Sequence, residues 1–450
     1  MRAGFAACDI TPRVGVEMYG FGPYINRASK GVYAPLEART AVFENGSRYI
    51  AVISCDLGDI SQDILQRTKA VLQEKMPEKE WEVAICASHT HSGPVSSDAT
   101  SGWGTADFPY IYLLPAKLCK SVLTAAENIT EVSASYGEGE CRHIGLNRLK
   151  DVDAPPLEVV LKEDWEPAKP ELTDTVCRVI RFDGKDGKLK GFIANFGCHP
   201  VVCSADNHYI HGDYPGVAMQ KLMKENPGAV GIFLQGAHGD INSGCVHKPQ
   251  KESLEALEVF AERFARGVRN ALANAAPMAD ETVKCICLEK TFSTKKVFDE
   301  EYLAALKQEF SQCFKNSDAS DNDLDIRINA VFLRGIEKIT KLLRNDRNDV
   351  EALVTGVRIG DVRILAGPCE IMSGIRKDVV ASYTAAIPWV VSLCNGSIGY
   401  APSDDVSAVT EHNSGGYEAV EVPLINGALP FANIHQELKK YMLEVAALLD

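Results

Sequence analysis

The sequence predicts an α/β fold with a mixed, largely parallel β-sheet core flanked by helices. Two observations support this class. Apolar runs at 49–55 and 81–87 have the length of buried strands, and the segment 59–76 between them carries apolar residues at helical spacing. The same alternation returns later, where an apolar run at 229–235 precedes a long helical pattern at 252–275. A strand, a helix and a second strand in this order usually form a parallel pair with a right-handed crossover.

The composition is that of an ordinary globular protein. The chain has 450 residues, of which 46% are hydrophobic and 24% are charged, so disordered and fibrous classes are excluded. Large α/β chains often keep one catalytic unit with insertions, and we expect a single domain over 1–450. The net charge of -14 argues against binding to nucleic acid or anionic lipid, because both attract basic surfaces. We therefore expect a small-molecule partner and no nucleic acid.

The elements of the N-terminal half follow from turn signals and periodicity. Asn45-Gly46 is a hairpin turn signal between two apolar strands, and a glycine-rich loop near the N-terminus lets backbone approach a ligand closely. In chain order, we expect a strand and turn at 5–12, the glycine-rich loop at 18–23, a hairpin at 38–56, a helix at 59–76, a strand at 81–87 and a helix at 113–127.

The second half continues the alternation around one charged segment. The segment 295–350 is charged and helical in pattern, and we expect a helical insertion or lid within the domain, because it contains no metal-ligand pattern. In chain order, the other expected elements are strands near 133–139, at 177–182 and at 189–196, a helix at 217–224, a strand at 229–235, a helix at 252–275, strands at 353–359, at 362–370 and at 389–393, and a helix at 436–449.

Two histidines follow the expected strand at 81–87. In an extended segment, His89 and His91 lie on the same face, with Thr90 opposite, so both imidazoles can point into one cleft. The carboxyl ends of strands are where α/β folds bind ligands. The pair therefore predicts half of a metal site, although an isolated pair of this kind can also be purely structural.

Later strands repeat this arrangement. His199 follows the strand at 189–196, and the strand at 362–370 ends in the carboxylate of Glu370. A histidine after one strand is more often structural than a ligand, but several strands that end in metal-binding residue types favour a shared site.

These segments together resemble a known family. The run Ser88-His89-Thr90-His91-Ser92-Gly93-Pro94, with Asn147-Arg148, the segment 195–200, Pro368-Cys369-Glu370, the segment 395–400 and Tyr417-Glu418, resembles the catalytic domain of neutral/alkaline, non-lysosomal ceramidases. The resemblance extends over nearly the whole chain, in the same order, without the C-terminal immunoglobulin-like domain usual in the family. It implies a neutral-ceramidase-like zinc hydrolase domain whose metal ligands are His89, His199, Glu370 and Tyr400. It also implies that the substrate site contains His91, Arg148 and Tyr417.

The chemistry of these residue types agrees with the implied activity. Zinc accepts neutral imidazole and carboxylate ligands, and a bound ion can activate water for attack on an amide carbonyl at neutral pH. His91, Arg148 and Tyr417 are suited to stabilise the oxyanion, and His91 or a tyrosine can protonate the leaving amine. The resemblance therefore implies a zinc-dependent amidohydrolase that cleaves a C–N bond.

The substrate-binding segment departs from the family pattern. The family usually has Gly-Asp-Val-Ser-Pro-Asn where this chain has the segment 239–244, which places Asn242 at the serine. We expect Asn242 and Gly20 to contact the substrate. Because no membrane-facing apolar element is evident, we expect a soluble N-acyl substrate more than ceramide in a bilayer.

The expected location is the cytoplasm. No segment reaches the ~18 consecutive apolar residues of a membrane-spanning helix, and the N-terminus lacks the apolar core of a signal peptide. The 14 cysteines are scattered singly, mostly in apolar strands, which favours reduced, buried thiols over a disulfide framework. We therefore expect no integral membrane association.

Two other functions fit the same residues. One is a binuclear metallohydrolase acting on another ester or amide, in which His89 and His91 join the further potential ligands His208, His211, Asp213, His238 and Asp240. The other is a metal-containing binding protein that has lost catalysis. The sequence leaves open the acyl and amine parts of the substrate, the number of metals, the oligomeric state and the pathway.

Overall fold

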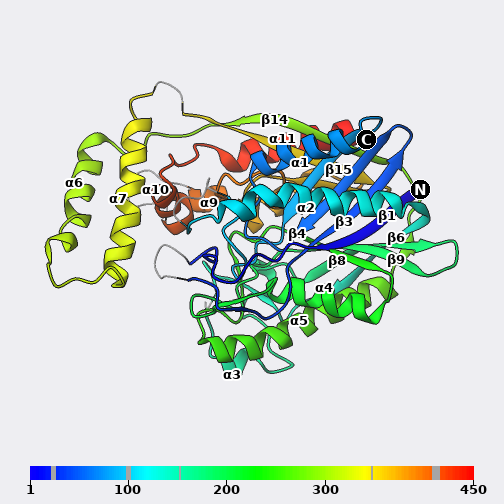
Figure 1. Ribbon diagram of the computed structural model, residues 1–450, viewed down its shortest axis with the longest axis horizontal. Coiled ribbons are helices and arrows are strands. Elements are labelled where there is room, and N and C mark those ends of the chain that lie inside the picture. Colours follow the sequence, from blue (N-terminus) through cyan, green and yellow to red (C-terminus); the bar gives the residue numbers. More distant parts are fainter. Residues whose placement is uncertain (22–26, 98–102, 152–153, 346–347, 408–415) are drawn as a thin grey trace.

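A mixed β-sheet forms the centre of the protein, in a computed structural model that describes residues 1–21, 27–97, 103–151, 154–345, 348–407 and 416–450 (Figure 1). Among these residues the main sheet has nine strands. In spatial order they are β11 (Val230–Gln235), β9 (Leu189–Phe196), β8 (Val176–Gly184), β6 (Thr130–Glu140), β1 (Arg2–Asp9), β3 (Glu37–Asn45), β4 (Arg48–Cys55) and β5 (Glu80–Ala87), with the short β13 (Ala276–Pro277) beside β6.

The sheet confirms the predicted mixed α/β class, but its pairing is less parallel than the sequence predicted. Among the described strands of this sheet, β4 pairs in parallel with β5 and β9 with β11, while the other pairs are antiparallel. The connections between consecutive strands explain this difference. Parallel neighbours are joined through a helix, whereas β3 and β4 meet in a tight turn at Asn45-Gly46 and β8 and β9 in another, which makes these pairs antiparallel.

A second, smaller sheet packs on one face of the main sheet. Its strands are β14 (Val283–Phe292), β15 (Val350–Ile359), β16 (Val362–Ala366) and β18 (Ile387–Val391). Phe43 and Phe182 of the main sheet share a buried apolar cluster with Ile364 and Trp389 of the small one. Burial of aromatic side chains between the sheets holds the two layers together.

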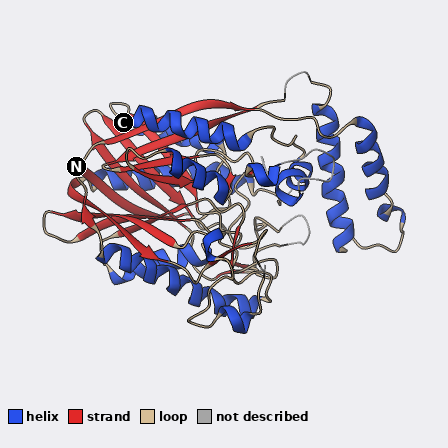
Figure 2. Ribbon diagram, turned by 180° about the vertical axis from the view of Figure 1, so that it is seen from behind, coloured by secondary structure: helices blue, strands red, loops and turns tan. Residues whose placement is uncertain are grey.

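Helices cover the two outer faces, so the protein has the layers helix, sheet, sheet, helix (Figures 1 and 2). The main sheet packs against α1 (Gln62–Lys75), α2 (Phe108–Glu127), α4 (Asp213–Glu225) and α5 (Gln250–Ala273), and the small sheet against α8 (Ser373–Ser382) and α11 (Ile434–Leu449). These helices agree with the periodicity, except that α2 begins before the expected residue 113 and α8 was not predicted. Among the described residues, no helix combines the length and apolar character needed to cross a membrane.

Two helices project from one end of the layers, as Figure 2 shows. They are α6 (Glu300–Phe310) and α7 (Leu324–Leu342). In the sequence they come between β14 and β15, which pair with each other as antiparallel neighbours. Both fall within 295–350, where the sequence predicts a helical insertion. That this insertion acts as a lid, and that 1–450 is one domain, stay predictions.

Short elements complete the edge at which the main strands end. Two parallel bridges place Glu370 opposite Tyr400, because β17 (Glu370–Ile371) pairs with β19 (Tyr400–Ala401). The other short elements are β2 (Gly31–Val32) with β10 (Tyr209–Ile210), β7 (Gly145–Asn147) with β12 (Ile241–Ser243), the helices α3 (Leu157–Val160), α9 (Asp404–Ser407) and α10 (Val422–Asn426), and the helical turns η1 (Pro170–Leu172), η2 (Cys313–Lys315) and η3 (Tyr417–Glu421).

Candidate metal centre and active site

Three histidines and one glutamate meet at the carboxyl ends of the main strands. His89 follows β5, His199 follows β9, His238 follows β11, and Glu370 begins β17. All four are buried, and one potential ligand atom from each lies within 4.8 Å of the others. The carboxylate is at the centre of the group. Its Oε2 is 3.2 Å from Nε2 of His89, 3.1 Å from Nε2 of His199 and 3.7 Å from Nε2 of His238.

The ring of His89 reaches the group through an unusual backbone conformation. Its φ is 68°, in the left-handed region that few non-glycine residues adopt. The strand itself agrees with the predicted 81–87, but the backbone at His89 is not extended, as the predicted shared face of His89 and His91 assumed. His89 and His91 still converge, because Nε2 of His91 lies 3.2 Å from Nε2 of His89. Strain of this kind persists where surrounding contacts over-determine it, and here the backbone N–H of His89 donates to the carbonyl oxygen of Leu57.

Backbone carbonyls orient all three imidazoles of the group. Nδ1 of His89 lies 2.6 Å from the carbonyl oxygen of Gly58, Nδ1 of His199 lies 2.7 Å from that of His238, and Nδ1 of His238 lies 3.1 Å from that of Gly236. Because a carbonyl only accepts, each Nδ1 carries a proton, and in a neutral ring this leaves the lone pair on Nε2. This is the arrangement that fixes histidine ligands around metal ions in proteins.

The electrostatics of the group also suit a cation. Burial lowers the pKa of His199 to about 4, and burial together with His199 holds the pKa of His238 well below its usual range, so both rings are neutral. Burial alone would raise the pKa of Glu370, but His89 and His199 outweigh it and hold the carboxylate ionised. Neutral imidazoles and a carboxylate are the ligand types that zinc accepts.

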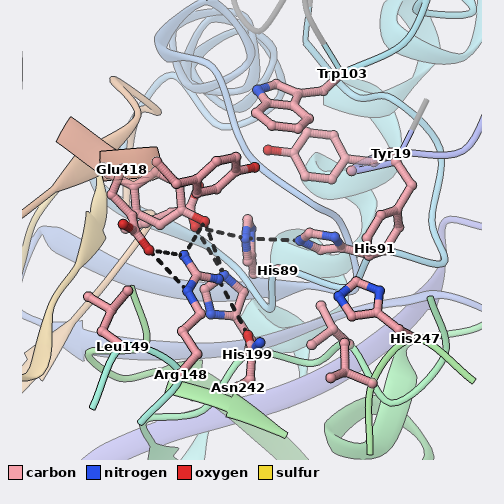
Figure 3. Close-up of a pocket in the computed structure, with 17 residues that line it drawn as sticks. Tyr19, His89, His91, Trp103, Arg148, Leu149, His199, Asn242, His247 and Glu418 are labelled. Carbon is pink, nitrogen blue, oxygen red and sulfur yellow. Dashed lines mark hydrogen bonds and ion pairs between the residues drawn. The ribbon is translucent and has the colours of Figure 1, made fainter. Parts of the chain in front are cut away.

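Arg148 lies beside this group and is held in place by three partners (Figure 3). Its Nη2 donates to Oε1 of Glu418 at 2.7 Å and to the hydroxyl of Tyr400 at 3.2 Å, and its Nη1 donates to Oδ1 of Asn242 at 3.4 Å. The side chain of Glu418 is only 2% exposed, so this ion pair is buried. Burial lowers the pKa of Arg148, but Tyr400 and Glu418 outweigh it and keep the guanidinium charged.

A cavity of about 480 Å³ opens over the group. Every residue that the sequence predicts for the site lines it, namely Gly20, His89, His91, Arg148, His199, Asn242, Glu370, Tyr400 and Tyr417. Much of the remaining wall is apolar or aromatic, from Tyr19, Phe21, Trp103, Leu149, Val201 and Val246, and Figure 3 shows Tyr19 and Trp103 together on one side. The roles of the predicted site residues in binding and catalysis stay predictions. Gly22 and Pro23 of the predicted loop lie outside the described residues.

Gly20 makes room for His91. Its φ is +96°, and a Cβ at this position would lie 2.2 Å from Nδ1 of His91. A side chain there would clash with the ring and would also strain the backbone. The structure therefore shows Gly20 as a residue that accommodates His91, in addition to its place on the cavity wall.

His238 is the member of the group that the implied ligand set does not contain. The available signal was a third strand followed by a histidine, in Gly236-Ala237-His238. Two of the further residues considered for a binuclear site have other partners. His211 contacts Asn207, and Asp240 accepts hydrogen bonds from Ser373 and Asn147. A single group of possible ligands occurs in the part of the chain that the structure describes.

Comparisons with known proteins agree with the fold and with the family resemblance. A family model described as "Neutral/alkaline non-lysosomal ceramidase, N-terminal" matches residues 1–324. The solved structure "Crystal Structure Analysis of neutral ceramidase from Pseudomonas aeruginosa" is similar at a TM-score of 0.72 and 18% identity, covering 100% of this chain and 74% of that one. "Ceramidase complexed with C2" is similar at a TM-score of 0.71 and 18% identity, covering 100% and 75%. At this identity the two structures support the fold, and Glu370, Tyr400 and Tyr417 lie beyond the residues that the family model matches.

Proposed function

Since this chain belongs to the neutral/alkaline non-lysosomal ceramidase family, we propose that it is a zinc-dependent amidohydrolase that cleaves the C–N bond of an N-acyl compound. Membership of the family supports a hydrolase that acts on amide bonds. The observation that carries the zinc part of the proposal is the buried group of imidazole nitrogens around one oxygen of Glu370.

His89, His199 and Glu370 are the proposed core of the zinc site, and the family resemblance adds Tyr400. The donor set fits the ion, because the Nε2 atoms of two imidazoles converge on one carboxylate oxygen while a backbone carbonyl engages each Nδ1. The hydroxyl of Tyr400 is 3.5 Å from Nε2 of His199, within reach of the same centre. A bound zinc ion supplies a nucleophile at neutral pH by lowering the pKa of water, and it polarises a carbonyl.

Arg148 is the proposed stabiliser of negative charge on the carbonyl oxygen. Its guanidinium is fixed by Glu418 and Tyr400 before any substrate binds, so no reorganisation is needed as charge develops. Tyr417 lies against it, with the Arg148 guanidinium 5.8 Å from the Tyr417 ring centroid. We assign Tyr417 to the same side of the substrate.

His91 is the proposed carrier of the proton that hydrolysis moves. The attacking water loses one proton and the leaving nitrogen gains one, so a single base that later acts as an acid balances the reaction. Burial and the neighbouring His89 lower the pKa of His91, which keeps its imidazole neutral and able to accept. Its Nε2 faces the metal-binding group, which places it next to the reacting atoms.

The cavity supports a small N-acyl substrate with an apolar acyl part. A volume of about 480 Å³ is typical of small-molecule sites, and its apolar and aromatic wall suits a hydrocarbon chain. Gly20 and Asn242 are the proposed contacts to the polar part of the substrate. We propose a soluble compound more than ceramide in a bilayer, and a cytoplasmic location stays a prediction from the sequence.

Metal analysis combined with a hydrolysis screen tests this function. The purified protein and the His89→Ala variant are assayed on N-acyl amides, ceramides and esters of graded acyl length. We expect about one zinc per chain and amide hydrolysis in the natural protein, and loss of both in the variant. Two metals per chain would instead support the binuclear alternative. A zinc-loaded protein that is inactive on the whole panel would support a binding protein.

A further inference from the structure

We propose that His238 is a direct ligand of the metal ion, so that three imidazoles and one carboxylate hold it. This inference rests on the proposed metal site. It goes beyond the ligand set that the family resemblance implies, which contains two histidines.

The Nε2 atom of His238 is buried with its lone pair unused. The side chain is fully buried, and Nδ1 is engaged with the carbonyl of Gly236 at 3.1 Å. No described residue offers Nε2 a hydrogen bond. A buried polar atom without such a bond is rare in folded proteins and calls for a partner. A metal ion is one partner that an unprotonated imidazole nitrogen can take.

The position of this nitrogen agrees with a shared ion. Nε2 lies 3.7 Å from Oε2 of Glu370, which is too long for a hydrogen bond. Two atoms bound at about 2.0–2.2 Å to one tetrahedral zinc ion are separated by about 3.3–3.6 Å. The distances from the same carboxylate oxygen to His89 and His199, 3.2 and 3.1 Å, are close to that range. All three histidine nitrogens therefore surround Glu370 at distances compatible with one ion.

The backbone that carries the His238 side chain is held by several hydrogen bonds. Its own carbonyl oxygen receives the Nδ1–H of His199 at 2.7 Å and the backbone N–H of Ile241 at 2.8 Å. The next residue, Gly239, donates its N–H to the carbonyl of Ile371, and a Cβ at Gly239 would lie 2.9 Å from the carbonyl oxygen of Glu370. The segment after β11 is thus packed tightly against the start of β17. His199, His238 and Glu370 form one rigid unit, as a preorganised metal site requires.

The test measures metal binding directly and does not depend on turnover. The metal is removed from the full-length protein, and zinc affinity is measured by competition with a chromophoric chelator in the natural protein, His238→Leu and His208→Leu. His208 is the matched control, because it is a half-buried histidine whose Nδ1 also contacts a backbone carbonyl, outside the group. Loss of a residue that only supports a ligand lowers metal affinity by about 10- to 100-fold. We expect His238→Leu to exceed that range and His208→Leu to match the natural protein.

Cobalt gives a spectroscopic readout of the ligand itself. In the Co²⁺-loaded protein, His238→Leu should shift the visible absorption bands, whereas His208→Leu should leave them unchanged. His238→Cys should bind Co²⁺ and add a near-ultraviolet thiolate-to-cobalt charge-transfer band, which arises only if the side chain at 238 binds the ion. This variant also keeps the proposal testable if the leucine variant fails to fold, as judged by circular dichroism of the metal-free proteins.

The outcomes separate this inference from the proposed function. An unchanged cobalt spectrum in His238→Leu, or the absence of the charge-transfer band in a folded, Co²⁺-loaded His238→Cys, overturns the inference while the metal-dependent hydrolase stands. A natural protein that binds neither zinc nor cobalt overturns both.

Discussion

Oε2 of Glu370 lies within 3.2 Å of Nε2 of His89, although one residue begins a short strand beside the small sheet and the other follows the edge strand of the main sheet. The contact joins the two layers at the bottom of the cavity. The carboxylate of Glu370 also faces the imidazoles of His199 and His238. The proposed metal site depends on this carboxylate.

Replacing Glu370 by glutamine should abolish metal retention and hydrolysis. The amide keeps the size of the carboxylate but removes the charge that balances the cation, and its nitrogen would face the imidazole nitrogens of His89 and His199. Metal content by mass spectrometry and amide hydrolysis measure the effect. Glu258→Gln, at a part-exposed surface pair with Lys221, is the matched control and should keep both. Full activity in Glu370→Gln would remove this residue from the site.

Gly20→Ala should slow turnover by about 100-fold or more while zinc stays bound, since loss of a positioned proton carrier costs at least that much. The added Cβ would lie 2.2 Å from Nδ1 of His91 and displace the ring, and its three nearest neighbouring atoms all belong to His91. Gly228→Ala is the control, because its φ of +92° imposes similar backbone strain with no atom within 4 Å. Equal turnover in the two variants would mean that the position of His91 does not matter for the reaction.

Arg148→Met should destabilise the fold as well as stop catalysis. Removing the guanidinium leaves the buried charge of Glu418 uncompensated, and breaking such a pair costs about 3–5 kcal/mol. The double variant Arg148→Met with Glu418→Gln should recover much of the free energy of unfolding but no activity. Urea unfolding of both variants, beside the natural protein, measures this. A double variant as unstable as the single one would show that packing, and not charge, is the cause.

His211 should make the protein less stable in acid. Burial, reinforced by the charge of Arg27, lowers the pKa of His211 to about 3, whereas an unfolded histidine titrates near 6.5. Between these values the unfolded chain binds a proton that the folded chain excludes. Its contribution to the free energy of unfolding is therefore complete above about pH 6.5 and is lost as the pH falls towards 3, by at most about 1.4 kcal/mol per pH unit.

The variant His211→Gln isolates this effect, because other groups titrate equally in both proteins. Urea unfolding of the metal-free proteins at several values between pH 4.5 and 7 gives the two pH dependences. The natural protein should lose stability more steeply than the variant as the pH falls. Parallel curves would mean that His211 is not held neutral by burial.

Most local elements, and most residues of the candidate site, could be predicted from the order of amino acids alone. Alternation of strand and helix patterns located β4, α1 and β5 to within a few residues, because the apolar period is set by each element's own geometry. Polar residues at expected strand ends pointed to His89, His199 and Glu370. The predicted strand at 362–370 is wrong in extent, because β16 ends at Ala366 and Glu370 begins the separate strand β17. The residues that the family resemblance singled out all line one cavity.

The contacts between these residues could not be predicted, because they depend on how the strands are ordered and packed. His238 lies beside His199 because β11 pairs in parallel with β9, and that neighbourhood follows from the order of strands in the sheet. The pairing of Arg148 with Glu418 and the fit of His91 against Gly20 likewise join distant parts of the chain. Periodicity reports which face of an element is buried. It does not report what packs against that face, because packing is chosen by the free energy of the whole fold.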